Sequence, residues 1–122
     1  MILITDGQDN ASETTIDETI SHVLKAEASI YAVNVDEDFS IELVKRATAN
    51  LKQLADATGG TYLRADADGT VGRAFAKIRR ELRSQYALAY RPSNLTDQVF
   101  HRLRVIARDD LRVRCRTGYY TK

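Results

Sequence analysis

Apolar segments of two kinds alternate through the first 83 residues of this 122-residue chain, and this alternation limits the fold more than any other feature. Short runs rich in apolar and β-branched residues lie at residues 1–5, 29–35 and 61–64, and they predict strands. Each run is followed by apolar residues at helical spacing. Strand and helix repeated three times predict an α/β fold: half of a doubly wound, Rossmann-like, mostly parallel three-layer sheet with right-handed crossovers.

The first run, Met1 to Thr5, has no polar alternation. Such a run suits a strand that is buried on both faces, as in a parallel sheet. It ends in Thr5-Asp6-Gly7, followed by Asp9, and open α/β sheets bind ligands at the carboxyl ends of their strands. Asp6 and Asp9 are therefore the candidate site residues.

Local signals place the ends of the helices. Thr15 with Glu18 fits a capping box at the start of a helix of about 12 residues, because each side chain can bond a free backbone N–H. Ser40 can cap the second helix. Gly59-Gly60 supplies a left-handed stop for that helix.

The pattern changes at Gln85. Residues 86–90, 100–108 and 111–116 are strand-like, with Arg91-Pro92 breaking the first run and Asp109-Asp110 forming a turn. They predict a three-stranded antiparallel extension with one arginine-rich face. We therefore expect residues 1–84 to form an α/β unit and residues 85–122 a β extension packed on it.

Composition and charge exclude some classes of protein. No segment approaches the roughly 18 apolar residues that span a bilayer, so no membrane span is expected. The first residues lack the basic region of a signal peptide, which makes the chain cytoplasmic by default, or secreted or envelope-bound if it belongs to a longer precursor. Cys115 has no partner for an internal disulfide, and we expect it to be half-buried in a strand.

Residues 1–63 carry 4 Lys/Arg and 11 Asp/Glu, whereas residues 64–122 carry 14 and 6. This asymmetry leaves open a basic nucleic-acid-binding module built on the C-terminal arginines. No aromatic residues interleave with these arginines as stacking platforms, so a solvated face or pairing with the acidic half is favoured and nucleic acid is not the expected partner. The arginines are at positions 102, 104, 108, 112, 114 and 116.

A second alternative is a magnesium-dependent phosphatase of the haloacid-dehalogenase type. Asp66-Ala67-Asp68-Gly69-Thr70 matches its nucleophile motif, with Asp66 as nucleophile and Asp68 as general acid/base. Only 52 residues follow Thr70, too few for the usual sheet. The structural interpretation is a turn in which Asp68 caps the third helix. His22 and His101 are far apart in sequence and are interpreted as surface or hydrogen-bonded histidines.

Several segments carry a family resemblance when taken in order. The first three are residues 2–10 with the Thr-Asp-Gly turn, residues 30–35, and residues 54–62, whose Leu-Ala…Thr-Gly-Gly-Thr-Tyr pattern closes a helix and opens a strand. Residues 78–86, 88–92 and 116–120 extend the match. The chain resembles the C-terminal half of a von Willebrand factor type A domain, of the bacterial "VWFA-related" subgroup of the Acidobacteria type.

This resemblance implies a non-enzymatic, adhesion-type module that binds a partner protein. It also implies a metal-ion-dependent adhesion site that holds Mg²⁺ or Mn²⁺ through an Asp-x-Ser-x-Ser loop, a Thr and the Asp of the Thr-Asp-Gly turn. Only Asp6 maps onto that set, and the sequence contains no Asp-x-Ser-x-Ser. Asp6, even helped by Asp9, is too small a ligand set for Mg²⁺, so no bound cation is expected in this chain.

In the family's sheet the Thr-Asp-Gly strand is central, and the strands that flank it on one side have no counterpart in these 122 residues. Met1–Thr5 is then an apolar sheet edge, and such edges recruit other strands. Three outcomes are expected for it: pairing with another copy in a homo-oligomer, coverage by the chain's own tail strands, or association with the missing half of the domain.

Overall fold

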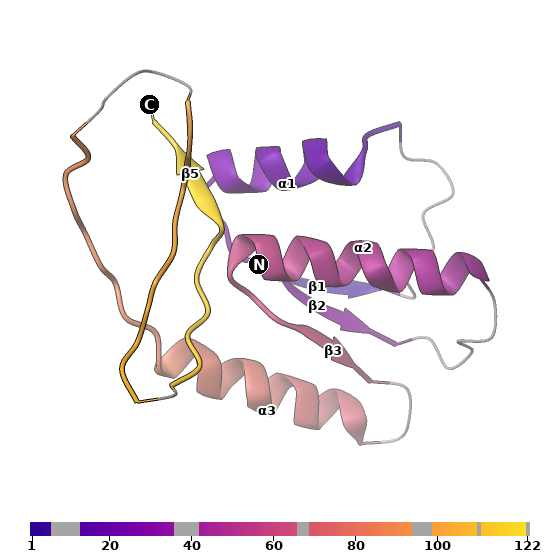
Figure 1. The fold of residues 1–122 in the computed structure, drawn as a ribbon. Coiled ribbons are helices and arrows are strands. Elements are labelled where there is room, and N and C mark those ends of the chain that lie inside the picture. Colours follow the sequence, from indigo (N-terminus) through magenta and orange to yellow (C-terminus); the bar gives the residue numbers. More distant parts are fainter. Residues whose placement is uncertain (6–12, 36–41, 66–68, 94–98, 110, 122) are drawn as a thin grey trace.

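The computed structural model describes residues 1–5, 13–35, 42–65, 69–93, 99–109 and 111–121. These residues form a mixed α/β structure, as the sequence predicts, with a parallel and an antiparallel sheet (Figure 1). The elements in chain order are β1 (Ile2–Thr5), α1 (Ile16–Lys25), β2 (Tyr31–Asn34), α2 (Glu42–Thr58), β3 (Tyr62–Arg64), α3 (Thr70–Arg83), β4 (Phe100–Arg102) and β5 (Gly118–Tyr120).

The main sheet has the order β1-β2-β3, and both pairings are parallel. Helices α1 and α2 lie on one side of it and α3 lies on the other (Figure 1). The core on the α3 side joins Tyr31 and Val33 of β2 to Ala74 and Ile78 of α3. Because β2 is the middle strand and has helices over both faces, all four of its residues are buried.

The predicted capping box at α1 is confirmed. The Glu18 carboxylate accepts a hydrogen bond from the Thr15 backbone N–H at 2.8 Å, and the Glu18 N–H donates to Thr15 Oγ1 at 3.3 Å. The bond from the Thr15 backbone lowers the pKa of Glu18. Ser40 lies outside the described residues. The N-cap residue of α3 is Gly69, whose backbone is in the left-handed conformation and which has no side-chain hydrogen bond to the helix. The prediction that Asp68 is the N-cap residue is therefore wrong.

The Thr-Gly-Gly segment joins the end of α2 to the start of β2. Thr58 donates to the Leu54 carbonyl at 2.8 Å and accepts from the Ile30 N–H at 3.0 Å, and its side chain is fully buried. Gly59 has φ +80°, which confirms the left-handed stop. A Cβ on Gly60 would lie 1.9 Å from the Ile30 carbonyl oxygen, so only glycine fits there. The Thr-Gly-Gly segment therefore has a structural role.

Strand β1 is less buried than its sequence predicts. Ile2 and Ile4 are 41% and 54% exposed, while Leu3 and Thr5 are partly buried. The expectation of a strand buried on both faces is wrong, because β1 pairs with β2 on one side and no described strand lies on the other. Among the described strands, β1 is at the edge of its sheet, as expected for Met1–Thr5.

The predicted three-stranded antiparallel extension is wrong in extent. Residues 86–90 form no strand, and among the described residues of the extension pairing is confined to β4 and β5, in the register Phe100↔Tyr120 to Arg102↔Gly118. Residues 111–116 are also irregular, and Cys115 is half-buried there but outside any strand. A two-stranded ribbon is only marginally stable on its own, and β5 contacts α1, so the pairing is found where a helix supports the ribbon. The tail strands do not cover β1 either, since they pair with each other.

The C-terminal segment, by which we mean the described residues 85–93, 99–109 and 111–121, docks at the amino ends of the parallel strands, at the left of Figure 1. The Thr117 N–H donates to the Ala57 carbonyl at 2.9 Å, near the end of α2. Ser21 of α1 and Tyr120 of β5 share a hydrogen bond of 3.0 Å between their hydroxyls. The opposite, carboxyl end of the sheet is therefore remote from β4 and β5. No helix among the described residues is long and apolar enough to cross a membrane.

Candidate functional site

The carboxyl ends of the three parallel strands meet at one edge of the sheet. Thr5 is in register with Asn34, and Asn34 is in register with Arg64. Two backbone bonds continue the ladder past the strand ends: Val35 N–H to the Thr5 carbonyl at 3.0 Å, and Ala65 N–H to the Asn34 carbonyl at 2.8 Å. We call this row, from Thr5 through Asn34 to Ala65, the carboxyl edge.

The predicted site residues follow this edge directly in sequence. Asp6 comes after Thr5, and Asp66 comes after Ala65. Asp6, Asp9, Asp66, Asp68 and the acidic run at residues 36–38 all lie outside the described residues. Within the part of the chain that the structure describes, no group of three or more His, Cys, Asp or Glu side chains is placed to hold a metal ion.

Asn34 is the most buried polar residue at the carboxyl edge, with no exposed surface. Its position at the end of the middle strand puts it between Thr5 and Arg64. The side-chain oxygens of Thr5 and Asn34 are neutral, and neutral oxygens alone are a poor ligand set for a divalent cation. Asn34 is fully buried, so its side chain is not placed to contact a partner. Sequence reasoning did not single out Asn34, although an amide closing an otherwise apolar strand is the signal that could have done so.

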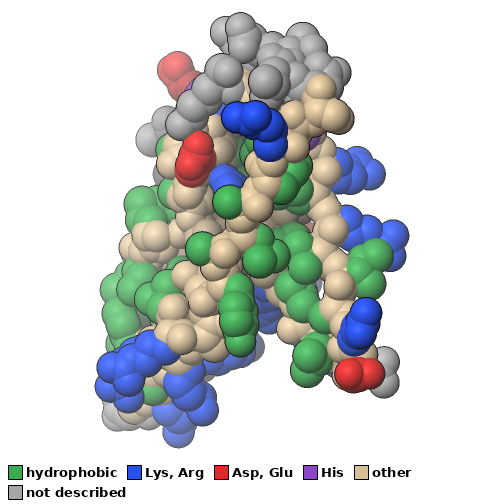
Figure 2. All heavy atoms as spheres, turned by 90° about the vertical axis from the view of Figure 1, so that its left-hand side faces the viewer, with side chains coloured by type: hydrophobic (Ala, Val, Ile, Leu, Met, Phe, Trp, Pro, Cys, Tyr) green, Lys and Arg blue, Asp and Glu red, His purple; other side chains and the backbone are tan. Residues whose placement is uncertain are grey.

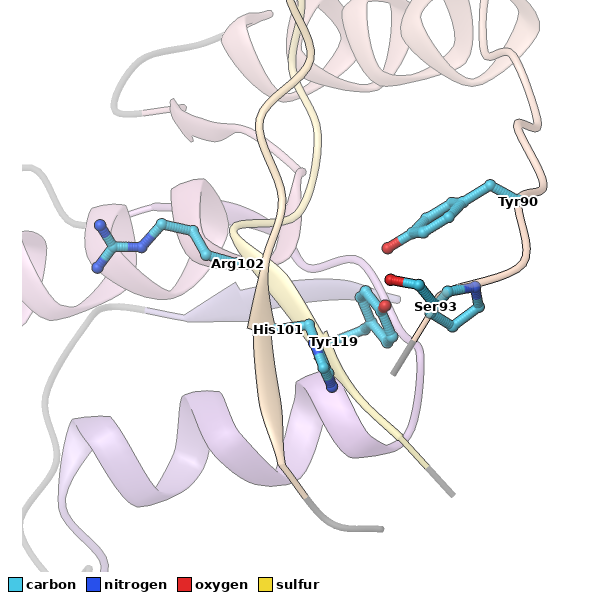
Figure 3. A pocket seen from close by; sticks show the side chains of 6 residues that line it. Tyr90, Ser93, His101, Arg102 and Tyr119 are labelled. Carbon is cyan, nitrogen blue, oxygen red and sulfur yellow. The ribbon is translucent and has the colours of Figure 1, made fainter. Parts of the chain in front are cut away.

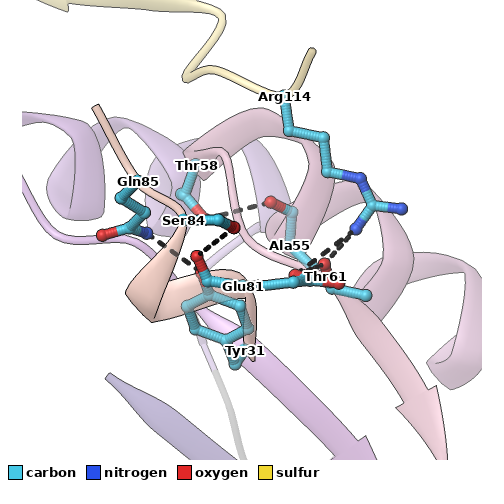
Figure 4. Close-up of polar contacts among 8 residues, drawn as sticks. All are labelled: Tyr31, Ala55, Thr58, Thr61, Glu81, Ser84, Gln85 and Arg114. Atoms are coloured by element: carbon cyan, nitrogen blue, oxygen red, sulfur yellow. Dashed lines mark hydrogen bonds and ion pairs between the residues drawn. The ribbon is translucent and has the colours of Figure 1, made fainter. Parts of the chain in front are cut away.

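A second polar group joins the C-terminal segment to the α/β unit (Figure 4). Thr61, just before β3, donates from its hydroxyl to the Glu81 carboxylate of α3 at 2.6 Å. The Arg114 guanidinium donates to that same hydroxyl and lies 3.9 Å from the Glu81 carboxylate. Gln85 donates to the Tyr31 hydroxyl at 3.1 Å. We call Tyr31, Thr61, Glu81, Gln85 and Arg114 the Glu81 cluster.

Burial raises the pKa of Tyr31, and the nearby negative charge of Glu81 raises it further. A tyrosine that ionises with more difficulty is a poor base or nucleophile at neutral pH. These bonds connect Gln85 and Arg114 of the C-terminal segment to Tyr31, Thr61 and Glu81, so the Glu81 cluster holds that segment against the α/β unit. Sequence reasoning missed it because Arg114 looked like one of several equivalent arginines.

The arginines of the predicted basic face have separate roles. Arg102, Arg104, Arg108 and Arg112 are exposed, whereas Arg116 is half-buried. Arg114 pairs with Glu81, which belongs to the basic half of the chain, so the expected pairing with the acidic half does not describe it. Figure 2 shows the face of the molecule that lies at the left of Figure 1. On this face hydrophobic side chains are interspersed with Lys and Arg side chains, and few acidic ones appear.

A shallow cavity of about 240 Å³ lies beside β4 and β5, lined by Tyr90, Pro92, Ser93, His101, Arg102 and Tyr119 (Figure 3). The His101 ring stacks on Tyr119 with centroids 5.1 Å apart, and Tyr90 meets Tyr119 edge-on at 6.0 Å. Hydrogen bonding to Tyr119 raises the pKa of Tyr90. The Arg102 side chain points away from the tyrosines, so it brings no charge to them (Figure 3).

The two histidines differ. His22 is exposed on α1, as expected for a surface residue. His101 is half-buried, and its Nε2 atom is buried without a hydrogen-bond partner among the described residues, so the interpretation of a surface or hydrogen-bonded histidine is wrong for it. Stacking on Tyr119 offsets part of the cost of that burial.

No protein-family model, no curated protein and no solved structure matches this chain.

Proposed function

We propose that this chain is a non-enzymatic protein-binding module of the von Willebrand factor type A kind, equivalent to the C-terminal half of that doubly wound domain, and that a partner protein binds at the carboxyl edge. The observation that carries the proposal is the alignment of three parallel strand ends, at Thr5, Asn34 and Ala65. An acidic segment follows each of them within two residues in sequence: Asp6, residues 36–38 and Asp66. Partner binding at this end of a parallel sheet follows the general rule for open α/β folds.

We propose further that this chain holds no resident Mg²⁺ or Mn²⁺. Asp6 is the one carboxylate in the sequence that matches the ligand set implied by the resemblance, and the Asp-x-Ser-x-Ser loop of that set has no counterpart. A divalent cation needs about six oxygen ligands, with carboxylates among them. The proposed binding by this chain therefore proceeds through direct contacts with the partner and does not require the cation of the intact domain.

A site-specific photo-crosslinking experiment tests the proposal. A photoreactive amino acid replaces Val35, which is 36% exposed beside the carboxyl edge, and a matched control replaces Lys77, which is exposed on the far side of α3. We expect a discrete protein adduct in a lysate of the source cells from position 35 but not from position 77, and unchanged by EDTA. No adduct, or equal adducts from both positions, would contradict it.

Two biochemical assays separate the alternatives. Magnesium-dependent hydrolysis of a generic phosphoester that is lost in Asp66→Asn would support the phosphatase instead. Retention on DNA that falls steeply with salt, and that weakens when Arg104 and Arg108 are replaced by Gln, would support nucleic-acid binding. We expect neither activity.

A further inference from the structure

The ribbon of β4 and β5 has two different faces. Adjacent residues of a strand point to opposite faces, so the side chains of Tyr119 and Tyr120 in β5 lie on different sides. Tyr120 is directed to α1, where its hydroxyl shares a bond of 3.0 Å with that of Ser21 and its ring centre lies 5.1 Å from Lys25 Nζ. Tyr119 is therefore on the face of the ribbon that α1 does not cover.

This outer face carries a group of aromatic rings. His101 of β4 is in register with Tyr119, and the two rings stack with their centroids 5.1 Å apart. Tyr90, which comes before β4 in the chain, meets Tyr119 edge-on at 6.0 Å and is 60% exposed. Tyrosine is enriched in binding interfaces because it joins an apolar ring to a polar tip. Three neighbouring rings that the fold leaves partly in solvent are thus a candidate binding platform.

The rings border the shallow cavity of about 240 Å³ beside β4 and β5. Figure 3 shows the hydroxyl groups of Tyr90, Ser93 and Tyr119 pointing toward one another, whereas Arg102 points away. Among the described residues that line the cavity, none has a carboxylate or an amide side chain. We call the following residues the tyrosine site: Tyr90, Pro92, Ser93, His101 and Tyr119.

The chemistry of the tyrosine site disfavours two kinds of ligand. A saccharide ring carries many hydroxyl donors, which are bonded best by the carboxylates and amides that this cavity lacks. Hydrogen bonding to Tyr119 raises the pKa of Tyr90, and the positive charge of Arg116 opposes that rise. The same charge works against a cationic ligand such as a quaternary ammonium group, which aromatic rings would otherwise attract.

A polyproline II segment meets the conditions that remain. Proline has no backbone N–H, so a proline-rich segment offers carbonyl acceptors and few donors. The polyproline II helix makes no internal hydrogen bonds, which leaves its carbonyls free to accept from the hydroxyls of the site. Segments of this kind bind in aromatic-lined grooves, and their preformed backbone keeps the entropy cost of docking low.

We propose that the tyrosine site binds a proline-rich, polyproline II segment of a partner protein, with proline rings against Tyr90 and Tyr119 and hydroxyl groups donating to its carbonyls. The site belongs to the C-terminal segment and is remote from the carboxyl edge (Figure 1). The proposal therefore does not rest on the function proposed above, and the two sites are tested separately.

An NMR titration of the full chain tests the proposal. The probe is a capped ten-residue polyproline peptide, and a capped Gly-Ser peptide of the same length is its control. We expect the polyproline peptide, and not the control, to shift the amide signals of Tyr90, His101 and Tyr119 in a saturable way. No shift, or an equal response to the Gly-Ser peptide, would overturn the proposal. Tighter binding of maltohexaose or of choline at these residues would also overturn it, in favour of a saccharide or a cation site.

Three variants place the binding at the tyrosine rings. Tyr90→Ala should weaken binding of the polyproline peptide by about tenfold or more, because it removes one aromatic wall. Tyr90→Phe keeps the ring and removes the hydroxyl donor, so it should weaken binding by about threefold to tenfold. Tyr86→Ala is the matched control and should leave the affinity unchanged, because Tyr86 is 91% exposed in the same segment but does not line the cavity. An affinity that survives Tyr90→Ala, or that Tyr86→Ala lowers equally, would contradict the proposal.

Discussion

Strands β1 and β2 are neighbours with four residues each and a similar apolar character, yet β2 is buried throughout and β1 is exposed at alternate residues. The difference does not come from their own sequences, because Ile2 and Ile4 are as apolar as Tyr31 and Val33. It comes from what surrounds them: β2 has a strand on each side and helices over both faces, whereas β1 has one strand neighbour and lies beyond the reach of α3. The burial of a strand thus depends on the strands and helices around it as much as on its own residues.

The strongest test of this contrast removes the cover over β2. Ile78 is 1% exposed and packs on Tyr31 and Val33. We expect Ile78→Ala to lower the free energy of unfolding by about 2–5 kcal/mol, measured by urea denaturation, because it leaves a cavity over the middle strand. A loss below about 1 kcal/mol would mean that α3 does not seal β2.

The next effect concerns the start of β2. Thr58 Oγ1 accepts the Ile30 N–H in a fully buried setting. Thr58→Val keeps the shape but leaves that donor without its acceptor, which should cost about 1–3 kcal/mol in the same urea experiment. Thr117→Val, at an exposed hydroxyl that donates to the Ala57 carbonyl, is the matched control and should cost less. Equal losses would show that the Thr58 bond has no special role.

A smaller, pH-dependent effect is expected in α1, the helix that connects β1 to β2. The pKa of Glu18 is lowered in the folded chain by its bond from the Thr15 N–H. A carboxyl with a lowered pKa stabilises the fold above its ordinary pKa, and this contribution is lost as pH falls through the folded-state value. Glu18→Ala should therefore be less stable than wild type at pH 7, and the difference should shrink in thermal melts at acid pH. A difference independent of pH would contradict this account.

The smallest effect is expected on β1 itself. Ile4 is 54% exposed, so Ile4→Thr should change the free energy of unfolding by no more than about 0.5 kcal/mol. Val33 is its register partner on the same face and is completely buried. Val33→Thr, which buries an extra hydroxyl, should cost about 1–3 kcal/mol. If the two substitutions cost the same, the contrast between edge and middle strand fails.

The order of elements in the α/β unit could be predicted from the sequence because its signals are local. The Thr15–Glu18 capping box and the stop at Gly59 depend on residues within a few positions, and both are confirmed. The exposure of β1 could be predicted only in part, because a continuous apolar run indicates burial while the lack of a second neighbour opposes it. Whether the apolar run or the missing neighbour decided the exposure of β1 depended on contacts between residues far apart in sequence.

The C-terminal segment was predicted less well for the same reason. Alternation in residues 111–116 indicated a strand, but a strand forms only where a partner is present, and pairing depends on the distant residues of β4. The role of Arg114 likewise depends on Thr61 and Glu81, which no local pattern connects to it. Of the candidate site, the strand end before Asp6 was placed correctly, and the assignment of Asp6 and Asp9 stays a prediction.

The position of Tyr31 gives this chain a built-in optical probe. The chain has six tyrosines and no tryptophan, so tyrosine alone provides its near-ultraviolet absorbance and fluorescence. Tyr31 should ionise at a higher pH than an ordinary tyrosine, because burial and the nearby Glu81 charge raise its pKa. Since Gln85 and Glu81 connect Tyr31 to the C-terminal segment, undocking of that segment should be visible as a change in tyrosine emission before the sheet unfolds.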